Sequence, residues 1–300
     1  MLKISNENLK KHKKTLKKNG WVLIKNVFSI EEIEQFRKDT LGFRDYYKKK
    51  GNIDSPGDLL SDNKLSSLVY NENILNIAKY LLNTNQLVYF GDSGAQIKSY
   101  DKRVSHGFHK DSASKDNQSS ADFNDNYPII RIGVYLQDHK RHSEGLIVRN
   151  GSHKFADITS GKPVSVPNEI GDIVIWYLTT THSGNAKRLK IFNDFSFGYD
   201  GTNNFLSLLW YRIPSFLSKP AHKDRMAIFL CYGVNNNILK RYIKYLTKRS
   251  YMLETWRSSN WKKDVLKKIN PNSLIVKDMP TKAKTVLKNE KGQGVFSLDS

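Results

Sequence analysis

The spacing of apolar residues changes along the chain, and the first forty residues predict a helix, a strand and a second helix. Residues 5–18 form a lysine-rich stretch typical of a helix, and residues 20–28 (GWVLIKNVF) are rich in the β-branched and aromatic residues that favour strands. In the helix predicted over residues 28–38, Ser29 and Glu32 have the spacing of a capping box. The chain therefore enters its second helix at a well-marked position.

A further helix is predicted next, and a region of short strands follows it. Apolar residues recur at helical spacing at Leu65, Leu68, Val69, Ile74, Ile77 and Leu81. From residue 87 the apolar runs are short, rich in Val, Ile, Tyr, Phe and Trp, and separated by turn residues: QLVYFGD, AQIKSYD, IIRIGVYLQD, GLIVRNGSH, GDIVIWYL and RMAIFLCYG. Many short strands at close spacing indicate a sandwich or a double-sheet jelly roll.

The pattern becomes helical again after Gly233, and it loses a clear period from about residue 270. No internal repeat or domain linker separates these parts. We therefore expect a mainly β protein with flanking helices, of the α+β class. Residues 1–234 would form the main domain, and residues 235–300 would form a basic helical extension packed on the same domain.

Composition and charge narrow the class of protein. With 300 residues, 38% hydrophobic and 11% aromatic, the chain can bury a substantial core. Its apolar runs are too short to span a bilayer, its N-terminus lacks the pattern of a secretory signal, and it has a single cysteine, so we expect a soluble cytoplasmic protein. Much of the net charge of +20 lies near the ends, in residues 1–19 and 235–300. Lysines beside an apolar stripe keep such helices soluble, so nucleic acid is a less favoured partner that the charge does not exclude.

The tripeptide HKD occurs twice, at residues 109–111 and 222–224. A His and an Asp two positions apart on an extended strand point to the same side, so either copy could bind one metal ion. Completing such a site usually takes a second His from a distant strand. No histidine follows His222, whereas His182 follows His109 at the end of the apolar segment GDIVIWYLTTTHSGN. This order favours the first copy.

These segments, in this order, resemble the phytanoyl-CoA dioxygenase family of Fe(II)- and 2-oxoglutarate-dependent oxygenases. The likeness covers roughly residues 15–235 and is most specific in GVYLQDHKRHSEGLIVRNGSHK. It implies a double-stranded β-helix, a cupin-like jelly roll. It also implies that His109, Asp111 and His182 bind iron, with 2-oxoglutarate and O2 as cosubstrates. Two imidazoles and one carboxylate leave three positions on Fe(II) open for these molecules.

The resemblance also suggests which residues bind 2-oxoglutarate. Its far carboxylate needs a cation, and the fork of an arginine fits both oxygens. We expect Arg225, which opens the run RMAIFLCYG, to serve this purpose, with Arg188 as the alternative because it lies nearer to His182 in the sequence. Lys98 resembles a family lysine that contacts the cosubstrate. Tyr135, on the side of its strand opposite the apolar set, is expected to face the interior and to contact 2-oxoglutarate as well.

The remaining candidate features are an apparent insertion, the second HKD and four other histidines. An apparent insertion at residues 189–223 contains a run of aromatic residues, which could be an extra buried helix or a lid over the metal. The second HKD would be the turn that leads to Arg225. Three histidines in polar loops, His106, His139 and His142, are expected to be solvent-exposed. His153 is expected to be a turn residue that hydrogen-bonds nearby backbone.

The reaction expected from the resemblance is hydroxylation of a C–H bond in a small or conjugated organic substrate, which could be anionic, with release of succinate and CO2. Related halogenases replace the metal-binding carboxylate with a small residue, and Asp111 keeps it here. Three alternatives remain. They are a 2-oxoglutarate oxygenase that acts on nucleic acid, a catalytically inactive cupin-like binding protein, and a cupin-like metal enzyme that does not use 2-oxoglutarate.

Overall fold

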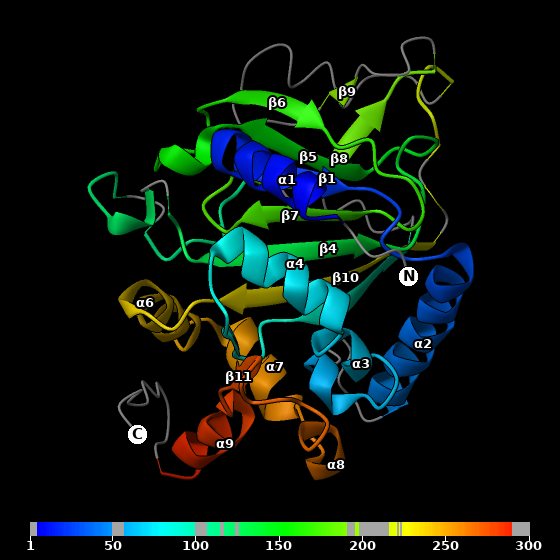
Figure 1. Cartoon of the computed structure of the whole chain (residues 1–300). Coiled ribbons are helices and arrows are strands. Elements are labelled where there is room, and N and C mark those ends of the chain that lie inside the picture. Colours follow the sequence, from blue (N-terminus) through cyan, green and yellow to red (C-terminus); the bar gives the residue numbers. More distant parts are fainter. Residues whose placement is uncertain are drawn as a thin grey trace. The chain divides into compact units, whose positions relative to one another are not determined.

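The computed structural model of the chain has mixed α and β structure in two compact units (Figure 1). It describes residues 5–49, 57–99, 107–114, 117–123, 126–190, 196–197, 216–220, 222 and 224–289. Unit 1 comprises residues 1–33, 97–127 and 133–227, and unit 2 comprises residues 34–96, 128–132 and 228–300. The boundaries between the units fall inside strands β4 (Ile129–Tyr135) and β10 (Asp224–Gly233), so each unit contains part of both strands.

Unit 1 contains two groups of hydrogen-bonded strands, which Figure 1 shows as separate layers. In the first group β1 (Trp21–Ile24) pairs antiparallel with β7 (Ile173–Tyr177), and β4 and β10 follow in that order. The second group has four antiparallel strands, in the order β6 (Lys162–Ser165), β5 (Gly145–Asn150), β8 (His182–Arg188) and β9 (Ser196–Phe197).

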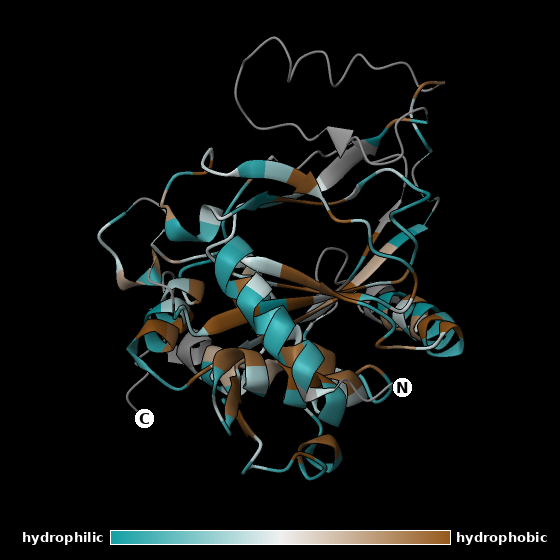
Figure 2. Ribbon diagram, turned by 45° about the horizontal axis from the view of Figure 1, so that its top comes forward, coloured by the Kyte–Doolittle hydropathy of each residue, from teal (hydrophilic) through white to brown (hydrophobic). Residues whose placement is uncertain are grey.

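Helix α1 (Asn6–Asn19) is rich in lysine and packs on β1 in unit 1. Leu9 and Leu16 are buried, while most of its lysines face solvent, so Figure 2 shows this helix largely in the hydrophilic colour. Ser5 caps its beginning and Gly20, with a φ of 83°, ends it in the left-handed conformation. Short 3-10 helices, η2 (Ala121–Phe123) and η3 (Ser152–Lys154), also belong to unit 1.

Unit 2 is mainly helical around a short strand. Its strand β2 (Leu87–Tyr89) is fully buried and pairs in parallel with β11 (Leu274–Val276), while Gly233 of β10 pairs antiparallel with Val88. The helices assigned wholly to unit 2 are η1 (Leu59–Ser61), α3 (Ser66–Val69), α4 (Glu72–Leu82), α6 (Asn237–Leu246), α7 (Ser250–Ser258), α8 (Lys263–Leu266) and α9 (Met279–Asn289). Helix α2 (Ile30–Lys49) begins in unit 1, and β3 (Gly94–Ser99) ends there.

The predicted helices and strands are present, with differences that have local causes. The capping box is confirmed, because the Ser29 N–H donates to the Glu32 carboxylate at 2.8 Å and the Glu32 N–H donates to the Ser29 hydroxyl at 3.2 Å. The prediction of a single helix through residues 65–81 is wrong, because this segment forms two helices, α3 and α4. Asn71 adopts an extended conformation there and accepts hydrogen bonds from the N–H groups of Asn73 and Ile74, so α4 begins anew.

Strands β6 and β8 have no clear apolar period and were not expected, and β11 and helix α9 lie in the tail after about residue 270, where the sequence showed no strong period. The division into residues 1–234 and 235–300 stays a prediction. Most of the apparent insertion at 189–223 lies outside the described residues. In the part of the chain that the structure describes, each helix is too short or too polar to cross a membrane.

Candidate active site

His109, Asp111 and His182 lie together in unit 1, as the sequence predicted. One ligand atom from each lies within 4.8 Å of the others. The distance from His109 Nε2 to Asp111 Oδ1 is 3.8 Å, and that from His182 Nε2 to Asp111 Oδ2 is also 3.8 Å. Separations of this size suit ligands arranged around one ion, because metal–ligand bonds to imidazole and carboxylate are about 2 Å long.

Backbone pairing brings these three residues together across a long stretch of sequence. The N–H groups of His109 and His182 each donate to the other residue's carbonyl at 3.0 Å, and the Asp111 N–H donates to the Leu178 carbonyl at 3.0 Å. His182 is the first residue of β8 and pairs with Val148 of β5. The HKD segment is thus held as a short extended piece beside the start of β8.

The two imidazoles are oriented for metal binding. His109 Nδ1 lies 3.0 Å from the Gly107 carbonyl, and His182 Nδ1 lies 3.0 Å from the Thr180 carbonyl. A carbonyl only accepts hydrogen bonds, so each Nδ1 carries the hydrogen, which leaves the lone pair on Nε2. Both Nε2 atoms face Asp111, and this donor set fits a divalent transition metal such as Fe(II).

Exposure differs across the three side chains: the exposed fraction is 45% for His109, 23% for Asp111 and 9% for His182. The site therefore opens on the side of His109, and His182 forms its buried side. Trp176 of β7 lines this buried side, with its ring centroid 5.4 Å from that of His182.

Lys110, between two of the proposed ligands, was not singled out from the sequence. Its side chain is buried, and its ammonium donates to the carbonyls of Ser152 at 2.8 Å and Thr179 at 2.7 Å. Burial lowers the pKa of Lys110 to about 7, although the Asp157 carboxylate acts in the opposite direction. These two bonds fasten the HKD segment to η3 and to the turn after β7.

Arg225 lies beside the proposed metal site. Gly184 stands two residues after His182 in β8, and the Arg225 guanidinium occupies the space that a Cβ at Gly184 would take. Burial lowers the pKa of Arg225, while Tyr135 and Glu144 act in the opposite direction, and the group stays cationic. Among the described residues, no hydrogen bond or ion pair joins this guanidinium to another side chain or to the backbone. A half-buried arginine in this state is suited to an anion.

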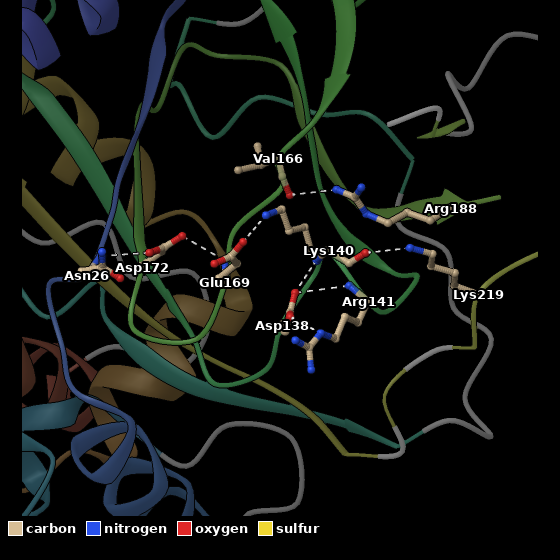
Figure 3. Close-up of polar contacts among 9 residues, drawn as sticks. All are labelled: Asn26, Asp138, Lys140, Arg141, Val166, Glu169, Asp172, Arg188 and Lys219. Carbon is tan, nitrogen blue, oxygen red and sulfur yellow. Dashed lines mark hydrogen bonds and ion pairs between the residues drawn. The ribbon is translucent and has the colours of Figure 1, made fainter. Parts of the chain in front are cut away.

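Arg188, the alternative, has protein partners instead (Figure 3). Its guanidinium donates to the Ser165 hydroxyl at 3.2 Å and to the Val166 carbonyl at 3.4 Å, and its N–H donates to the Ser143 hydroxyl at 3.1 Å. These bonds tie β8 to β6 and to the segment just after it. The geometry therefore favours Arg225 over Arg188 as the residue left for a ligand.

The other two expected cosubstrate contacts have different outcomes. Tyr135 is buried in β4, on the interior side that the sequence favoured, and it lies close enough to Arg225 to act on the pKa of that residue. Lys98 lies in β3, but its side chain is outside the described part of the chain. Contacts of either residue with 2-oxoglutarate stay predictions.

The expectation of solvent exposure is wrong for His139, whereas His153 is a turn residue that bonds to backbone, as the sequence predicted. His139 is buried, with an exposed fraction of 1%, because Asn168 and Gln137 supply partners for both of its ring nitrogens. His153 is also buried, and its Nε2 lies 3.1 Å from the Lys17 carbonyl at the end of α1, far away in the sequence.

The second HKD segment lies close to the loop histidine His142. His222 Nδ1 lies 3.0 Å from the Asp224 carbonyl, and its ring centroid is 5.0 Å from that of His142. His222 is therefore the turn residue that leads into β10, as predicted, whereas His142 is half-buried and not exposed as expected, because its Nδ1 lies 2.8 Å from the Asp138 carbonyl. His106 lies outside the described residues.

Comparison with known proteins places the fold. No family model matches the chain, and no curated protein does so either. The solved structures of three proteins are similar. One is the non-heme monooxygenase ThoJ, with 16% identity, a TM-score of 0.53 and 74% of this chain matched to 76% of that one. Another is EctD from S. alaskensis with bound Fe, with 15% identity, a TM-score of 0.52 and 77% of each chain matched.

The third is the non-heme alpha ketoglutarate dependent epimerase SnoN from nogalamycin biosynthesis, with 15% identity and a TM-score of 0.50; 76% of this chain matches 82% of that one. Likeness at this level of identity concerns the fold. The narrower resemblance to the phytanoyl-CoA dioxygenase family stays a prediction. The chain is thus similar in fold to enzymes described as non-heme iron or alpha-ketoglutarate-dependent, and it has a His-Asp-His cluster that can hold a metal.

Proposed function

We propose that this protein is an Fe(II)- and 2-oxoglutarate-dependent oxygenase. The observation that carries the proposal is the pairing of two features in one unit. The Nε2 atoms of His109 and His182 each lie 3.8 Å from a carboxylate oxygen of Asp111, and the guanidinium of Arg225 in β10 lies against Gly184, two residues after His182. The similar folds of ThoJ, SnoN and EctD support the same class.

The metal would be held by His109, Asp111 and His182. Three protein ligands on one face of Fe(II) leave the opposite face for the cosubstrates and O2. When bound, the iron and 2-oxoglutarate supply the oxidising power that attacks an unactivated C–H bond, with succinate and CO2 as products. The protein's own contribution is to hold the ligands, fix the tautomer of each imidazole, and keep the His182 side of the site dry.

Arg225 would bind the far carboxylate of 2-oxoglutarate. Its guanidinium can form two parallel hydrogen bonds to one carboxylate, and burial strengthens them because little water competes. Tyr135 lies close enough to raise the pKa of Arg225, and its phenol is the second donor in this proposal. Lys98 remains a third candidate from the resemblance.

The finer assignments rest on the resemblance and on Asp111. The two strand layers of unit 1 support a double-stranded β-helix of the cupin-like type. The metal-binding carboxylate supports hydroxylation over halogenation, since Asp111 occupies the position that a halide would need. The proposed substrate is a small or conjugated organic molecule.

The test is succinate formation from 2-oxoglutarate by the purified chain with Fe(II) and O2, with and without candidate substrates. We expect slow turnover without substrate. His182→Ala should abolish metal binding, measured with Mn(II) by isothermal titration calorimetry, whereas His222→Ala should retain it. The two variants are matched, because each removes one imidazole near β8 or β10. Absence of both 2-oxoglutarate binding and succinate formation would refute the proposal.

A further inference from the structure

His139 is a buried histidine for which the proposed chemistry has no use. It lies in the turn between β4 and β5, and its backbone N–H donates to the Asn168 carbonyl at 3.0 Å. Its ring packs so closely on Gly145 that a Cβ there would come within 2.8 Å of the imidazole Cγ. A buried imidazole with a glycine beneath it and defined partners has a fixed position.

Both ring nitrogens of His139 belong to a chain of hydrogen bonds that ends next to Arg225. The Asn168 Oδ1 atom is 2.9 Å from Nδ1, and the Gln137 Nε2 atom is 3.0 Å from the ring Nε2. The other end of the Gln137 amide, Oε1, accepts the Met226 backbone N–H at 2.8 Å. Met226 directly follows Arg225 in β10.

The direction of every bond in this chain follows from one backbone group. The Met226 N–H can only donate, so the Gln137 atom facing it is the oxygen, and the Gln137 nitrogen faces His139. That nitrogen also donates, so His139 Nε2 must accept. The hydrogen of the neutral ring therefore sits on Nδ1 and is donated to the Asn168 oxygen.

The same ring borders the residues assigned to the cosubstrate. Its centroid lies 4.8 Å from that of Tyr135. Burial, and after it the positive charge of Arg225, lower the pKa of His139 to about 3. A protonated ring would place a hydrogen on Nε2 against the Gln137 amide, so the network and the burial both require the neutral form. A neutral neighbour adds no competing cation beside Arg225.

We propose that His139 is a positioning residue for carboxylate recognition, which holds Arg225 and Tyr135 in place through the relay Asn168–His139–Gln137–Met226. This inference rests on the proposed function, because it assigns the carboxylate to 2-oxoglutarate. The Met226 carbonyl accepts the Leu136 N–H at 3.1 Å, so both backbone groups of the residue after Arg225 are held by Leu136 and Gln137, the two residues that follow β4.

The experiment compares two ligands and two variants. The ligands are 2-oxoglutarate and 2-oxopentanoate, which has the same carbon chain without the far carboxylate. His139→Gln keeps one donor and one acceptor, whereas His139→Phe fills the space and removes both. We expect His139→Phe to reduce the preference for 2-oxoglutarate by roughly tenfold or more, because small displacements of a binding group have large effects. His139→Gln should retain most of the preference.

Mn(II) affinity and the affinity for 2-oxopentanoate should stay within about twofold in both variants, since the relay does not reach the metal ligands. In the double variant His139→Phe/Arg225→Met the two losses of 2-oxoglutarate affinity should not add, because both substitutions act on the contact between Arg225 and the far carboxylate. His142→Gln, in the same turn, is the matched control and should behave as the wild type. A general loss of stability would instead weaken both ligands alike, and that result would overturn the proposal.

Two measurements separate this inference from the proposed function. If the wild type does not prefer 2-oxoglutarate, the proposed function fails, whatever His139 does. The position of Arg225 is tested independently by crystal structures of both His139 variants: the guanidinium should leave Gly184 in His139→Phe and stay in His139→Gln. A guanidinium that remains in place in His139→Phe overturns the inference, as does an Nε2–H tautomer of wild-type His139 by 15N NMR.

Discussion

Because Gly184 has no side chain, it leaves room for the guanidinium of Arg225. The Arg225 guanidinium fills the volume beside this residue, and the chain bends there, since the pairing of β8 with β5 changes register between Ser183 and Ala186. An arginine head is the flexible end of a long side chain, so a methyl group at Gly184 would displace it before it displaced the backbone.

We therefore expect Gly184→Ala to raise the KM for 2-oxoglutarate by roughly tenfold or more, because the guanidinium loses its position. Mn(II) affinity and the urea midpoint should change little. Gly94→Ala is the matched control, because a Cβ at Gly94 would meet nothing within 4 Å. Only the KM for 2-oxoglutarate should change in Gly184→Ala. An unchanged KM would contradict the proposal that Arg225 binds 2-oxoglutarate.

The buried ammonium of Lys110 holds the HKD segment in place through two backbone carbonyls. In Lys110→Met the carbonyls of Ser152 and Thr179 would lose their buried donor, which costs about 1–3 kcal/mol of unfolding free energy. The HKD segment would also lose its anchor, so metal affinity should fall by about 10- to 100-fold. Urea denaturation and Mn(II) titration measure the two effects. Lys154→Met, at an exposed lysine of η3, is the control, and equal metal affinity in both variants would argue against anchoring.

The cluster of His109, Asp111 and His182 was predictable from the sequence, whereas the contacts of Lys110, Gly184 and His139 were not. His109, Asp111 and His182 keep an order and a strand context that can be read along the chain. The segment DHKRHSEG is strongly polar, which wrongly indicated an exposed His139. Its burial depends on Asn168 and Gly145, whose proximity only the fold creates.

At the scale of elements, strands with β-branched and aromatic runs were predicted and polar strands were not. The sequence HSGNAKR of β8 has no apolar alternation, and it is a strand because β5 and β9 pair with its two edges. The short β11 likewise follows an unpatterned segment and forms on β2. In both cases tertiary pairing decides the structure where local propensity does not.

The pairing of β11 with β2 can be tested with one substitution. Leu274 is buried and pairs with Leu87, so Leu274→Asp would place a carboxylate in an apolar core. We expect unit 2 to lose about 3–5 kcal/mol of stability, or to fail to fold. Asn272→Asp, an exposed neighbour, should be close to neutral. Urea denaturation followed by tryptophan fluorescence compares them, and similar midpoints would show that β11 contributes little.

At the scale of the whole molecule, buried charge makes the stability of unit 2 depend on pH. Asp58 is fully buried, accepts the Tyr89 hydroxyl at 2.5 Å and accepts the Leu60 N–H at 3.0 Å. Burial raises the pKa of Asp58 to about 7, although these hydrogen bonds act against the rise. Between about pH 4 and pH 7 the unfolded chain has released this proton while the folded chain keeps it.

The contribution of Asp58 to stability is therefore complete below about pH 4 and is lost as pH rises to about 7. We expect the unfolding free energy of the wild type, relative to Asp58→Asn, to fall between about pH 4 and pH 7 and then to level off. Asparagine has a similar shape and does not titrate, so the difference isolates this group. Urea titrations at several pH values measure it, and a constant difference would exclude the raised pKa.

The parallel pairing of β2 with β11 also has a consequence during synthesis. Leu87 meets Leu274, so β2 waits for a partner that the ribosome makes about 190 residues later. At about 5–20 residues per second that delay is on the order of 10–40 seconds. During that time Leu87, Val88 and Tyr89, fully buried in the finished protein, have an open strand edge on the nascent chain. Unpaired apolar strand edges of this kind can pair with other chains until residue 274 has been made.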